Sequence, residues 1–327
     1  MSSDPVSPSR PGLLRRAWDW LPANVDRRVV WAAWTTLVVQ IGIVGTGGLV
    51  RLTGSGLGCP TWPSCTTDSL VPTPEYAQHG LIEFGNRLLT FVLAIVAIVT
   101  FLLVLRMRRH RGDLFWLAFG IGMYIPLQAV LGGITVLTNL NPYVVSLHFL
   151  ASAVLVALSA AFVVRVYAVP GPRARAVPLW YAIVTHVTSL AVAVTVIVGS
   201  LVTGAGPHAG DNAAARNGLD PELMQHIHSW PAYATFGLTV VLVIGAWRTA
   251  PALRLRLWTG LLLAVEILQI AVGLWQANTG LPIALVNIHM VLAMMLVAAM
   301  TAVVMHLKAP VRAAAADEAL VSRTVHA

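Results

Sequence analysis

The sequence predicts an all-α integral membrane protein, with eight transmembrane helices in two pseudo-symmetric four-helix bundles produced by internal duplication. Three observations support this prediction. The 327 residues are 57% hydrophobic and only 10% charged, whereas a soluble domain carries about 25% charged residues. Eight apolar stretches are long enough to cross a hydrocarbon core, which takes about 20 residues. A set of residues also recurs at constant spacing in the two halves of the chain, as in a repeat protein.

The eight apolar stretches are expected to be helices, because backbone polar groups in lipid must be satisfied within their own segment. They lie near residues 29–50, 80–105, 114–137, 144–168, 179–203, 224–247, 257–277 and 284–307. The N-terminal half is therefore 29–168 and the C-terminal half 179–307. Residues 1–28 are polar and Pro-rich, so a disordered tail is expected there without a cleavable signal peptide; a similar tail is expected at 308–327.

Basic residues are concentrated on one side of the predicted membrane. Of 21 Lys and Arg residues, 18 lie in the two tails and in alternate loops. The opposite loops hold only Arg51 and Arg216, and Arg87 lies in a helix. The positive-inside rule then places both termini in the cytoplasm. The net charge of +8 is thus interpreted as a topology signal and an attraction to anionic lipid, not as nucleic-acid binding.

The internal repeat is clearest where the third and fourth stretches of each half meet. Gln128, Gly132, Leu140 and His148 recur 141 positions later as Gln269, Gly273, Leu281 and His289. Further upstream, Glu83-x-x-Asn86 aligns with Gln225-x-x-His228 at a shift of 142. Gly47-Gly48 likewise aligns with Gly199-Ser200. The repeat therefore predicts two equivalent four-helix units, each with one histidine early in its last helix.

His148, His228 and His289 lie at similar depth near the outer ends of the even-numbered predicted helices. A lone membrane histidine commonly serves as an interhelical hydrogen-bond donor. Ligation of a metal or haem iron from two facing helices is the alternative, which the shared depth favours. Zinc is disfavoured because no close second ligand accompanies these histidines. His226 points about 200° away from His228 round the helix, so only one of the two can face the interior well, and the repeat alignment selects His228.

Two acidic residues fall within predicted spans. An acid inside the membrane is a functional candidate by default, because burying its charge is costly. Glu83 has Arg87 at i+4, and an ion pair between them would lower that cost without excluding a functional role. Glu266 has no acidic counterpart in the repeat, and a proton path or an interhelical hydrogen bond are the two interpretations.

The two cysteines, Cys59 and Cys65, lie in a Gly/Pro-rich loop on the predicted outer side. A disulfide is plausible in such an oxidising compartment. It would be either a structural staple or a redox-active pair. The spacing alone favours the staple.

The string Gly-Ser-Gly-Leu-Gly-Cys59-Pro-Thr-Trp-Pro-Ser-Cys65, the motif Ile82-Glu83-Phe-Gly-Asn86-Arg87 and the pair Leu147-His148 resemble the haem A synthase family. The resemblance implies a bacterial plasma-membrane enzyme that oxidises the C8 methyl of haem O to the formyl group of haem A. It implies a haem b cofactor on His228 and His289, and a substrate site that includes His148, with Asn86 and Arg87 as further substrate-site candidates. Glu83 is the implied catalytic acid, and Cys59 and Cys65 are implicated in activity. The implied partners are haem O synthase and the cytochrome c oxidase assembly machinery.

The sequence departs from this family at Asn86, where the pattern has a histidine, and an amide is a poor iron ligand. Either His148 binds the substrate iron alone, or His79 of the adjacent loop replaces the missing ligand. A bis-histidine quinol-oxidising electron carrier and a haem chaperone for oxidase assembly are the alternative functions. The electron acceptor, the oxygen source and the oligomeric state stay open.

Overall fold

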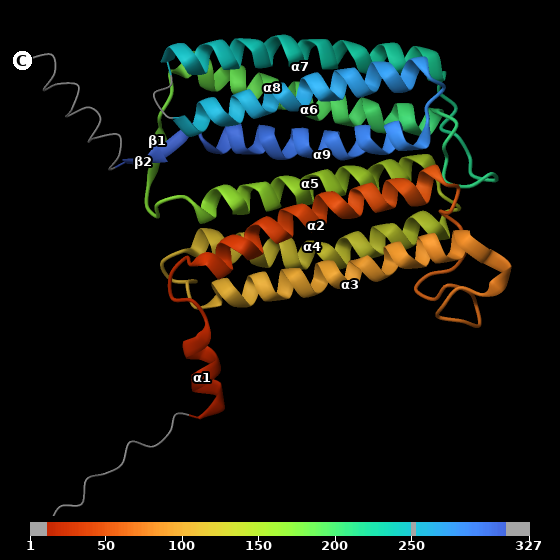
Figure 1. Ribbon diagram of the computed structural model, residues 1–327, viewed down its shortest axis with the longest axis horizontal. Helices are drawn as coiled ribbons and strands as arrows, with labels where there is room; N and C mark the ends of the chain where they lie inside the picture. The colour runs from red at the N-terminus through yellow and green to blue at the C-terminus, as the bar shows by residue number, and fades with distance from the viewer. Residues whose placement is uncertain (1–11, 250–252, 312–327) are drawn as a thin grey trace, which may run out of the picture.

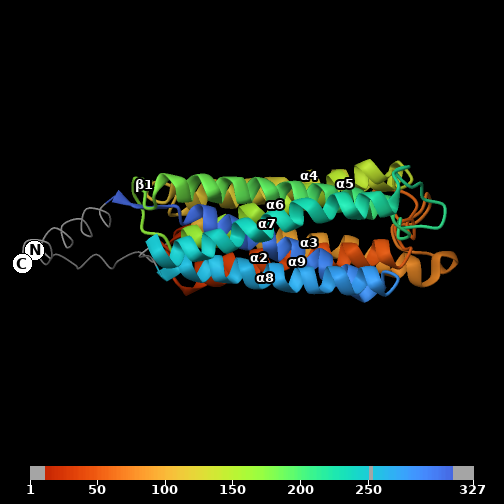
Figure 2. The same ribbon diagram turned by 90° about the horizontal axis from the view of Figure 1, so that it is seen from above.

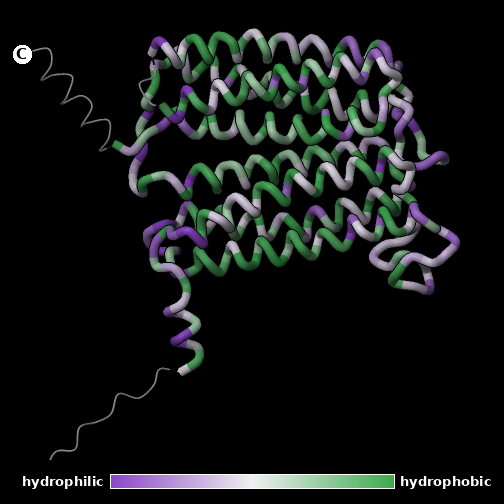
Figure 3. The backbone as a smooth tube through the Cα atoms, in the orientation of Figure 1, coloured by the Kyte–Doolittle hydropathy of each residue, from purple (hydrophilic) through white to green (hydrophobic). Residues whose placement is uncertain are grey.

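The computed structural model describes residues 12–249 and 253–311, and it is almost entirely helical (Figure 1). Eight helices within these ranges are long and apolar enough to cross a membrane, which confirms the predicted integral membrane fold. They are α2 (Arg27–Leu52), α3 (Ala77–Leu105), α4 (Gly112–Leu137), α5 (Pro142–Val166), α6 (Leu179–Ala205), α7 (Pro221–Thr249), α8 (Leu253–Asn278) and α9 (Ile283–Met305). Hydrophobic residues cover their middle portions, and hydrophilic residues gather at both ends (Figure 3).

The helices form two rings of four. In the first ring α2 contacts α3, α3 contacts α4, α4 contacts α5, and α5 returns to α2. In the second, α6, α7, α8 and α9 follow each other in the same way, and α9 returns to α6. The rings join through contacts of α9 with α2 and α5, and of α5 with α6. The two rings lie side by side with their helices roughly parallel to one long axis (Figures 1 and 2).

Helix α9 belongs to the cores of both rings. Its Met294 and Ala298 pack in the apolar core of the first ring, while Leu296, Ala299 and Met300 pack in that of the second. Small residues on α2 allow this close approach: a Cβ added at Gly45 would lie 3.0 Å from Val291 of α9. In lipid such packing, rather than the hydrophobic effect, drives helix association.

The turns that precede α5 and α9 have the same backbone. Asn139 and Leu140 have positive φ values of 51° and 58°, and Gly280 and Leu281 have 76° and 58°. The amide of Leu140 donates to the Thr135 carbonyl over 2.8 Å, and that of Leu281 to the Gln276 carbonyl over 2.9 Å. Left-handed residues at a helix C-terminus satisfy carbonyls that the helix leaves free. The matching turns support the predicted duplication.

Two features lie at the end of the rings that carries most of the arginines, here called the basic end. A short helix, α1 (Leu13–Trp20), occupies part of the segment predicted to be disordered, so that expectation fails for these residues. Strand β1 (Arg173–Arg175) pairs antiparallel with β2 (Lys308–Pro310), a contact that the sequence did not predict. Residues 1–11 and 312–327 of the predicted tails lie outside the described residues.

Candidate functional site

The candidate residues gather at the opposite end of the rings, here called the loop end. Glu83, His148 and His289 each lie six residues after the first residue of α3, α5 and α9, and His228 lies seven after that of α7. At 1.5 Å per residue all four are about 10 Å inside their helices. The equal depth expected from the sequence is therefore present.

His228 and His289 face each other across the second ring. Their helices, α7 and α9, occupy opposite corners, and the ring centroids are 6.4 Å apart with the ring planes at 73°. An imidazole nitrogen bonds a metal at about 2 Å and lies about 1.1 Å from its ring centre, so two rings on one ion have centroids about 6.2 Å apart. The observed separation fits one metal ion held between the two rings.

A glycine on the preceding helix receives each histidine ring. A Cβ added at Gly199 of α6 would lie 2.9 Å from Cε1 of His228, and one at Gly273 of α8 would lie 3.0 Å from Cε1 of His289. In the first ring, Gly132 of α4 is related in the same way to His148, at 3.4 Å. Carbon atoms normally stay about 3.5–4.0 Å apart. Only glycine therefore leaves enough room for the two closest rings.

These histidines suit a metal ion whose other ligands come from a bound molecule and not from the protein. The Nδ1 atoms of His148, His228 and His289 are buried without a hydrogen-bond partner in the described ranges. No group of three or more His, Cys, Asp or Glu side chains among the described residues could hold a metal ion. Two facing imidazoles alone fit an iron whose other four ligands come from a porphyrin.

The first ring offers an incomplete version of this arrangement. His148 of α5 and Asn86 of α3 occupy opposite corners, as His289 and His228 do in the second ring. The Asn86 side-chain oxygen accepts a hydrogen bond from Thr46 Oγ1 over 2.8 Å. A Cβ at Gly47 would lie 3.9 Å from Asn86 Nδ2. Asn86 thus occupies the place predicted by the repeat, with its oxygen engaged by α2.

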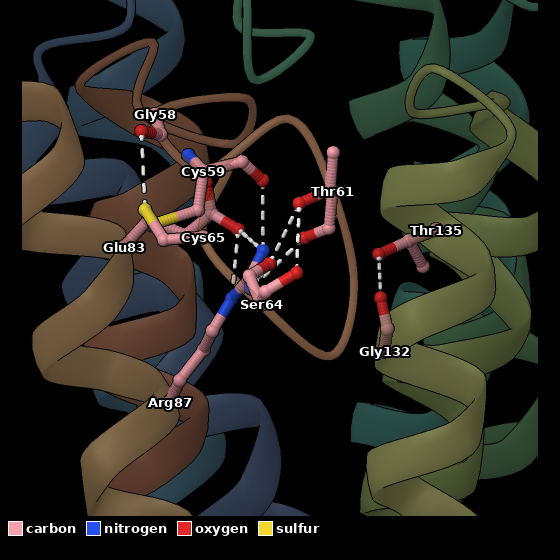
Figure 4. A network of polar contacts seen from close by, with 9 residues as sticks. All are labelled: Gly58, Cys59, Thr61, Ser64, Cys65, Glu83, Arg87, Gly132 and Thr135. Atoms are coloured by element: carbon pink, nitrogen blue, oxygen red, sulfur yellow. Dashed lines mark hydrogen bonds and ion pairs between the residues drawn. A yellow bond between two sulfur atoms is a disulfide. The ribbon is translucent and has the colours of Figure 1, made fainter. Parts of the chain in front are cut away.

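The loop that contains both cysteines, residues 58–65 and here called the cysteine loop, is fastened to α3. Cys59 and Cys65 are fully buried and form a disulfide, as predicted. The Cys59 amide donates to Oε2 of Glu83 over 2.6 Å, and Oε1 of the same carboxylate accepts from Nη2 of Arg87 over 2.5 Å. Figure 4 shows the loop folded over these side chains. Glu83 therefore has both oxygens engaged and is only 5% exposed.

Arg87 makes most of the hydrogen bonds that hold the cysteine loop against α3. Its guanidinium donates to the Cys59 carbonyl over 2.8 Å, to the Thr61 carbonyl over 3.0 Å and to the Ser64 carbonyl over 3.1 Å. Its Nε also donates to Glu83 Oε1 over 3.2 Å. The predicted i, i+4 ion pair is present. The guanidinium thus binds loop backbone, and at the Ser64 carbonyl it shares the acceptor with the Thr61 hydroxyl.

The cysteine loop reaches across the first ring to the helix beside His148. The indole of Trp62 occupies the place that a Cβ of Gly133 would take on α4. The neighbouring Gly132 is the glycine that receives the His148 ring. The cysteine loop and His148 therefore pack against α4 at adjacent glycines, Gly133 and Gly132.

The remaining candidates are resolved individually. His79 lies in the first turn of α3, not in a loop as predicted, and its Nδ1 is 2.9 Å from Ser55 Oγ. His226 is exposed on α7, as expected once the repeat alignment had selected His228 for the interior. Glu266 accepts a 2.8 Å hydrogen bond from Thr239 of α7, which supports the interhelical-bond interpretation. The sequence did not predict the contacts between glycines and histidine rings, or the anchoring of the cysteine loop by Arg87. The recurrence of Gly132 as Gly273 could have indicated the glycine contacts.

Comparison with known proteins gives a family and several relatives. A family model described as cytochrome oxidase assembly protein (COX15-CtaA) matches residues 30–301. A protein named heme A synthase from Lysinibacillus sphaericus is 34% identical over 125 residues, which are 38% of this chain and 40% of the relative. The heme A synthases of Listeria welshimeri and Listeria innocua are each 33% identical over 136 residues, 39% of this chain and 44% of theirs. The chain thus matches less than half the length of these relatives.

Proposed function

The chain belongs to the cytochrome oxidase assembly protein family, and we propose that it is a haem A synthase. It oxidises the C8 methyl group of haem O to a formyl group, giving haem A for cytochrome c oxidase. The similarity to proteins named heme A synthase supports this activity. The enzyme acts in the plasma membrane of a bacterium with both termini in the cytoplasm, a proposal based on the arginine distribution and the eight spans.

One observation carries the proposal: the two rings differ at corresponding positions. The second ring has a facing pair, His228 and His289, at 6.4 Å. The first has a single histidine, His148, opposite Asn86, under a disulfide loop that the second lacks. An electron carrier would use two complete pairs. One complete pair beside an incomplete one is what an enzyme needs if one haem is a resident cofactor and the other a substrate that enters and leaves.

The second ring, residues 179–307, is proposed to hold haem b. His228 and His289 would hold its iron, and Gly199 and Gly273 leave room for their rings. The haem b supplies one-electron redox chemistry when bound. Gln269 donates from Nε2 to the His289 carbonyl over 3.1 Å, which fixes the α8–α9 contact beside the ligand.

The first ring, residues 29–168, is proposed to bind haem O as substrate. His148 contributes the single protein nitrogen, while Asn86 is held away from that role by Thr46. Glu83 lies at the same depth and provides a carboxylate that can stabilise positive charge developing next to the porphyrin or accept a proton. Its bonds to Cys59 and Arg87 give it a second task, since they hold the cysteine loop over the site.

The decisive test is haem analysis of bacterial membranes in which the full chain is expressed together with a haem O synthase. Haem A should form only when the chain is present. A chain that binds haem without forming haem A would instead be an electron carrier or a haem chaperone for oxidase assembly.

The variant Glu83→Gln separates the two tasks of this carboxylate. The amide oxygen still accepts from the Cys59 amide, and Arg87 keeps its three loop carbonyls. We expect normal haem b content, an intact disulfide and little or no haem A. Haem A formation at the wild-type rate would show that the charge has no catalytic role, whereas loss of the loop structure would assign Glu83 to anchoring alone.

A further inference from the structure

A cavity of about 230 Å³ opens between the two rings at the basic end, far from the histidines. Trp34 of α2 and Tyr167, which follows α5, line it from the first ring. Arg254 and Trp258 of α8 and His306, which follows α9, line it from the second. This feature is here called the inter-ring crevice, and α5 and α9 diverge towards it in Figure 1. Nothing in the proposed haem chemistry uses it.

The walls of the inter-ring crevice are aromatic and cross-linked. Trp34 donates from its indole nitrogen to the Tyr167 hydroxyl over 3.0 Å. The guanidinium carbon of Arg254 lies 6.0 Å from the centre of the Tyr167 ring, and Trp258 and His306 have ring centroids 6.4 Å apart. Tryptophan and tyrosine side chains are typical of the membrane–water interface. The aromatic lining of the crevice is therefore of the kind found at headgroup depth.

Among the described residues, positive charge beside the crevice exceeds the acidic charge that is free to balance it. Burial lowers the pKa of the Arg173 guanidinium, and the neighbouring Arg165 lowers it further, against the opposing effect of Asp113. Arg254 lines the crevice, and Arg173 lies beside it, because its Nη2 donates to the carbonyl of Lys308, two residues after the crevice residue His306. None of the ion pairs within the described ranges includes Arg173 or Arg254.

The acids nearest this end are already engaged with other arginines. Within residues 12–249 and 253–311, Asp19 pairs with Arg106, Asp26 with Arg28, and Asp113 with Arg111. Arg173 also has an unpaired hydrogen-bond donor. Its Nη2 donates to the Lys308 carbonyl over 2.6 Å, but its buried Nη1 has no partner among the described residues. A buried donor without a partner is costly, so an acceptor from outside the chain would stabilise this arrangement.

We propose that the inter-ring crevice binds the phosphate of an anionic phospholipid from the inner leaflet, with Arg254 of its lining and the neighbouring Arg173 as the phosphate-binding residues. Basic pockets between transmembrane helices on the cytoplasmic side are known sites for anionic lipid headgroups. The first segments of the acyl chains lie against Trp34 and Trp258. The lipid thereby joins the two rings at the end where no histidine pair or cysteine loop holds them.

A redox ligand such as a quinone fits this position poorly. His306, directly after the end of α9, follows His289 by 17 residues, a separation of about 25 Å at 1.5 Å per residue. An occupant of the crevice is thus remote from both proposed haem sites. The excess of guanidinium groups also favours an anion over a neutral ring.

The test compares the full-length protein with two double variants. Arg173→Gln/Arg254→Gln removes the proposed phosphate contacts. Arg108→Gln/Arg109→Gln removes the same charge from exposed positions at the basic end that do not line the crevice. Each protein is purified in mild detergent, and bound phosphatidylglycerol and phosphatidylcholine are counted by native mass spectrometry during titration with each lipid.

We expect wild type to retain phosphatidylglycerol in preference to phosphatidylcholine. One basic residue near the membrane surface changes lipid affinity about fivefold, so the crevice double variant should bind about 25-fold more weakly. The Arg108/Arg109 control should match wild type. Displacement of the lipid by millimolar inorganic phosphate would assign the site to free phosphate instead.

Three results would overturn the proposal. They are equal retention of both lipids by wild type, unchanged retention by the crevice variant, and recovery of a quinone or a haem in place of lipid. The first comparison needs no variant, so the proposal stays testable if Arg173→Gln/Arg254→Gln fails to accumulate. Haem content of each preparation serves as the check on folding. The outcome is independent of whether the chain forms haem A.

Discussion

The glycines that receive the histidine rings allow a quantitative prediction. In Gly199→Ala and Gly273→Ala the new Cβ would lie 2.9 and 3.0 Å from Cε1 of His228 and His289. Carbon atoms in ordinary contact are about 3.5–4.0 Å apart, so each ring must retreat by roughly 0.5–1 Å. Both rings belong to the proposed iron site, and a retreat of either disturbs the axial geometry.

The size of the effect follows from the strain in the displaced histidine. A departure of about 30° from a side-chain rotamer costs about 0.5–1.5 kcal/mol, which corresponds to roughly 2- to 13-fold weaker haem binding. Gly132→Ala should have a smaller effect on His148, because its Cβ would lie 3.4 Å from the ring. The order of effects is therefore Gly199 and Gly273 first, then Gly132.

The matched control is Gly260→Ala on α8, where a new Cβ would meet nothing within 4 Å. All these substitutions raise helix propensity by up to about 1 kcal/mol, so they share any general effect on folding. The assay is titration of haem b into the purified apoprotein, followed by the low-spin absorption bands. If Gly199→Ala and Gly273→Ala bind haem as Gly260→Ala does, with an unchanged spectrum, the rings are not held by these glycines.

Three further outcomes are expected. His228→Ala should remove most bound haem b and its low-spin spectrum, whereas His226→Ala, at an exposed position on the same helix, should keep both; equal haem content in the two variants would contradict the assignment. Arg87→Lys should leave loop carbonyls without donors, because an ammonium has three donors and no planar fork. Added thiol should then reduce the disulfide faster than in wild type, as measured by alkylation and mass spectrometry. Thr239→Val should destabilise the protein by about 1–3 kcal/mol, because Glu266 loses its hydrogen-bond donor. Glu266→Gln should retain a hydrogen bond to Thr239 and unfold at a higher temperature than Thr239→Val. Equal midpoints of thermal unfolding in detergent would refute the reasoning.

The predicted spans lie close to the observed helices because a helix that crosses a membrane needs a run of about 20 apolar residues, which is visible in the sequence. The predicted stretch 29–50 became Arg27–Leu52, and 144–168 became Pro142–Val166. The differences lie at the helix ends, where the chain leaves the hydrocarbon and apolar composition no longer reports helix formation. The β-ribbon of Arg173–Arg175 with Lys308–Pro310 escaped prediction because three-residue strands so far apart carry no periodic signal.

The candidate site was predictable in its parts. Equal spacing in the repeat picked out His148 and His289. Helical periodicity indicated that only one of His226 and His228 faces the bundle, and the repeat alignment selected His228. The Cys59–Cys65 disulfide followed from the small number of cysteines and the predicted outer location. The position of Glu83 in a span marked it as unusual, whatever its role, because a membrane penalises an unpaired charge.

What the sequence determined by itself was therefore the fold class and the eight spans, together with a set of candidate site residues, since each depends on composition or on spacing along the chain. Only the tertiary structure decided what those residues face. The 6.4 Å approach of His228 and His289 depends on α7 and α9 standing at opposite corners of one ring. Arg87 binds three loop carbonyls, and Trp62 of the same loop packs against Gly133 of α4. Both contacts depend on how a loop without regular structure folds back on the helices. Such contacts join residues distant along the chain, and no local pattern encodes them because their geometry is set by packing of the whole bundle.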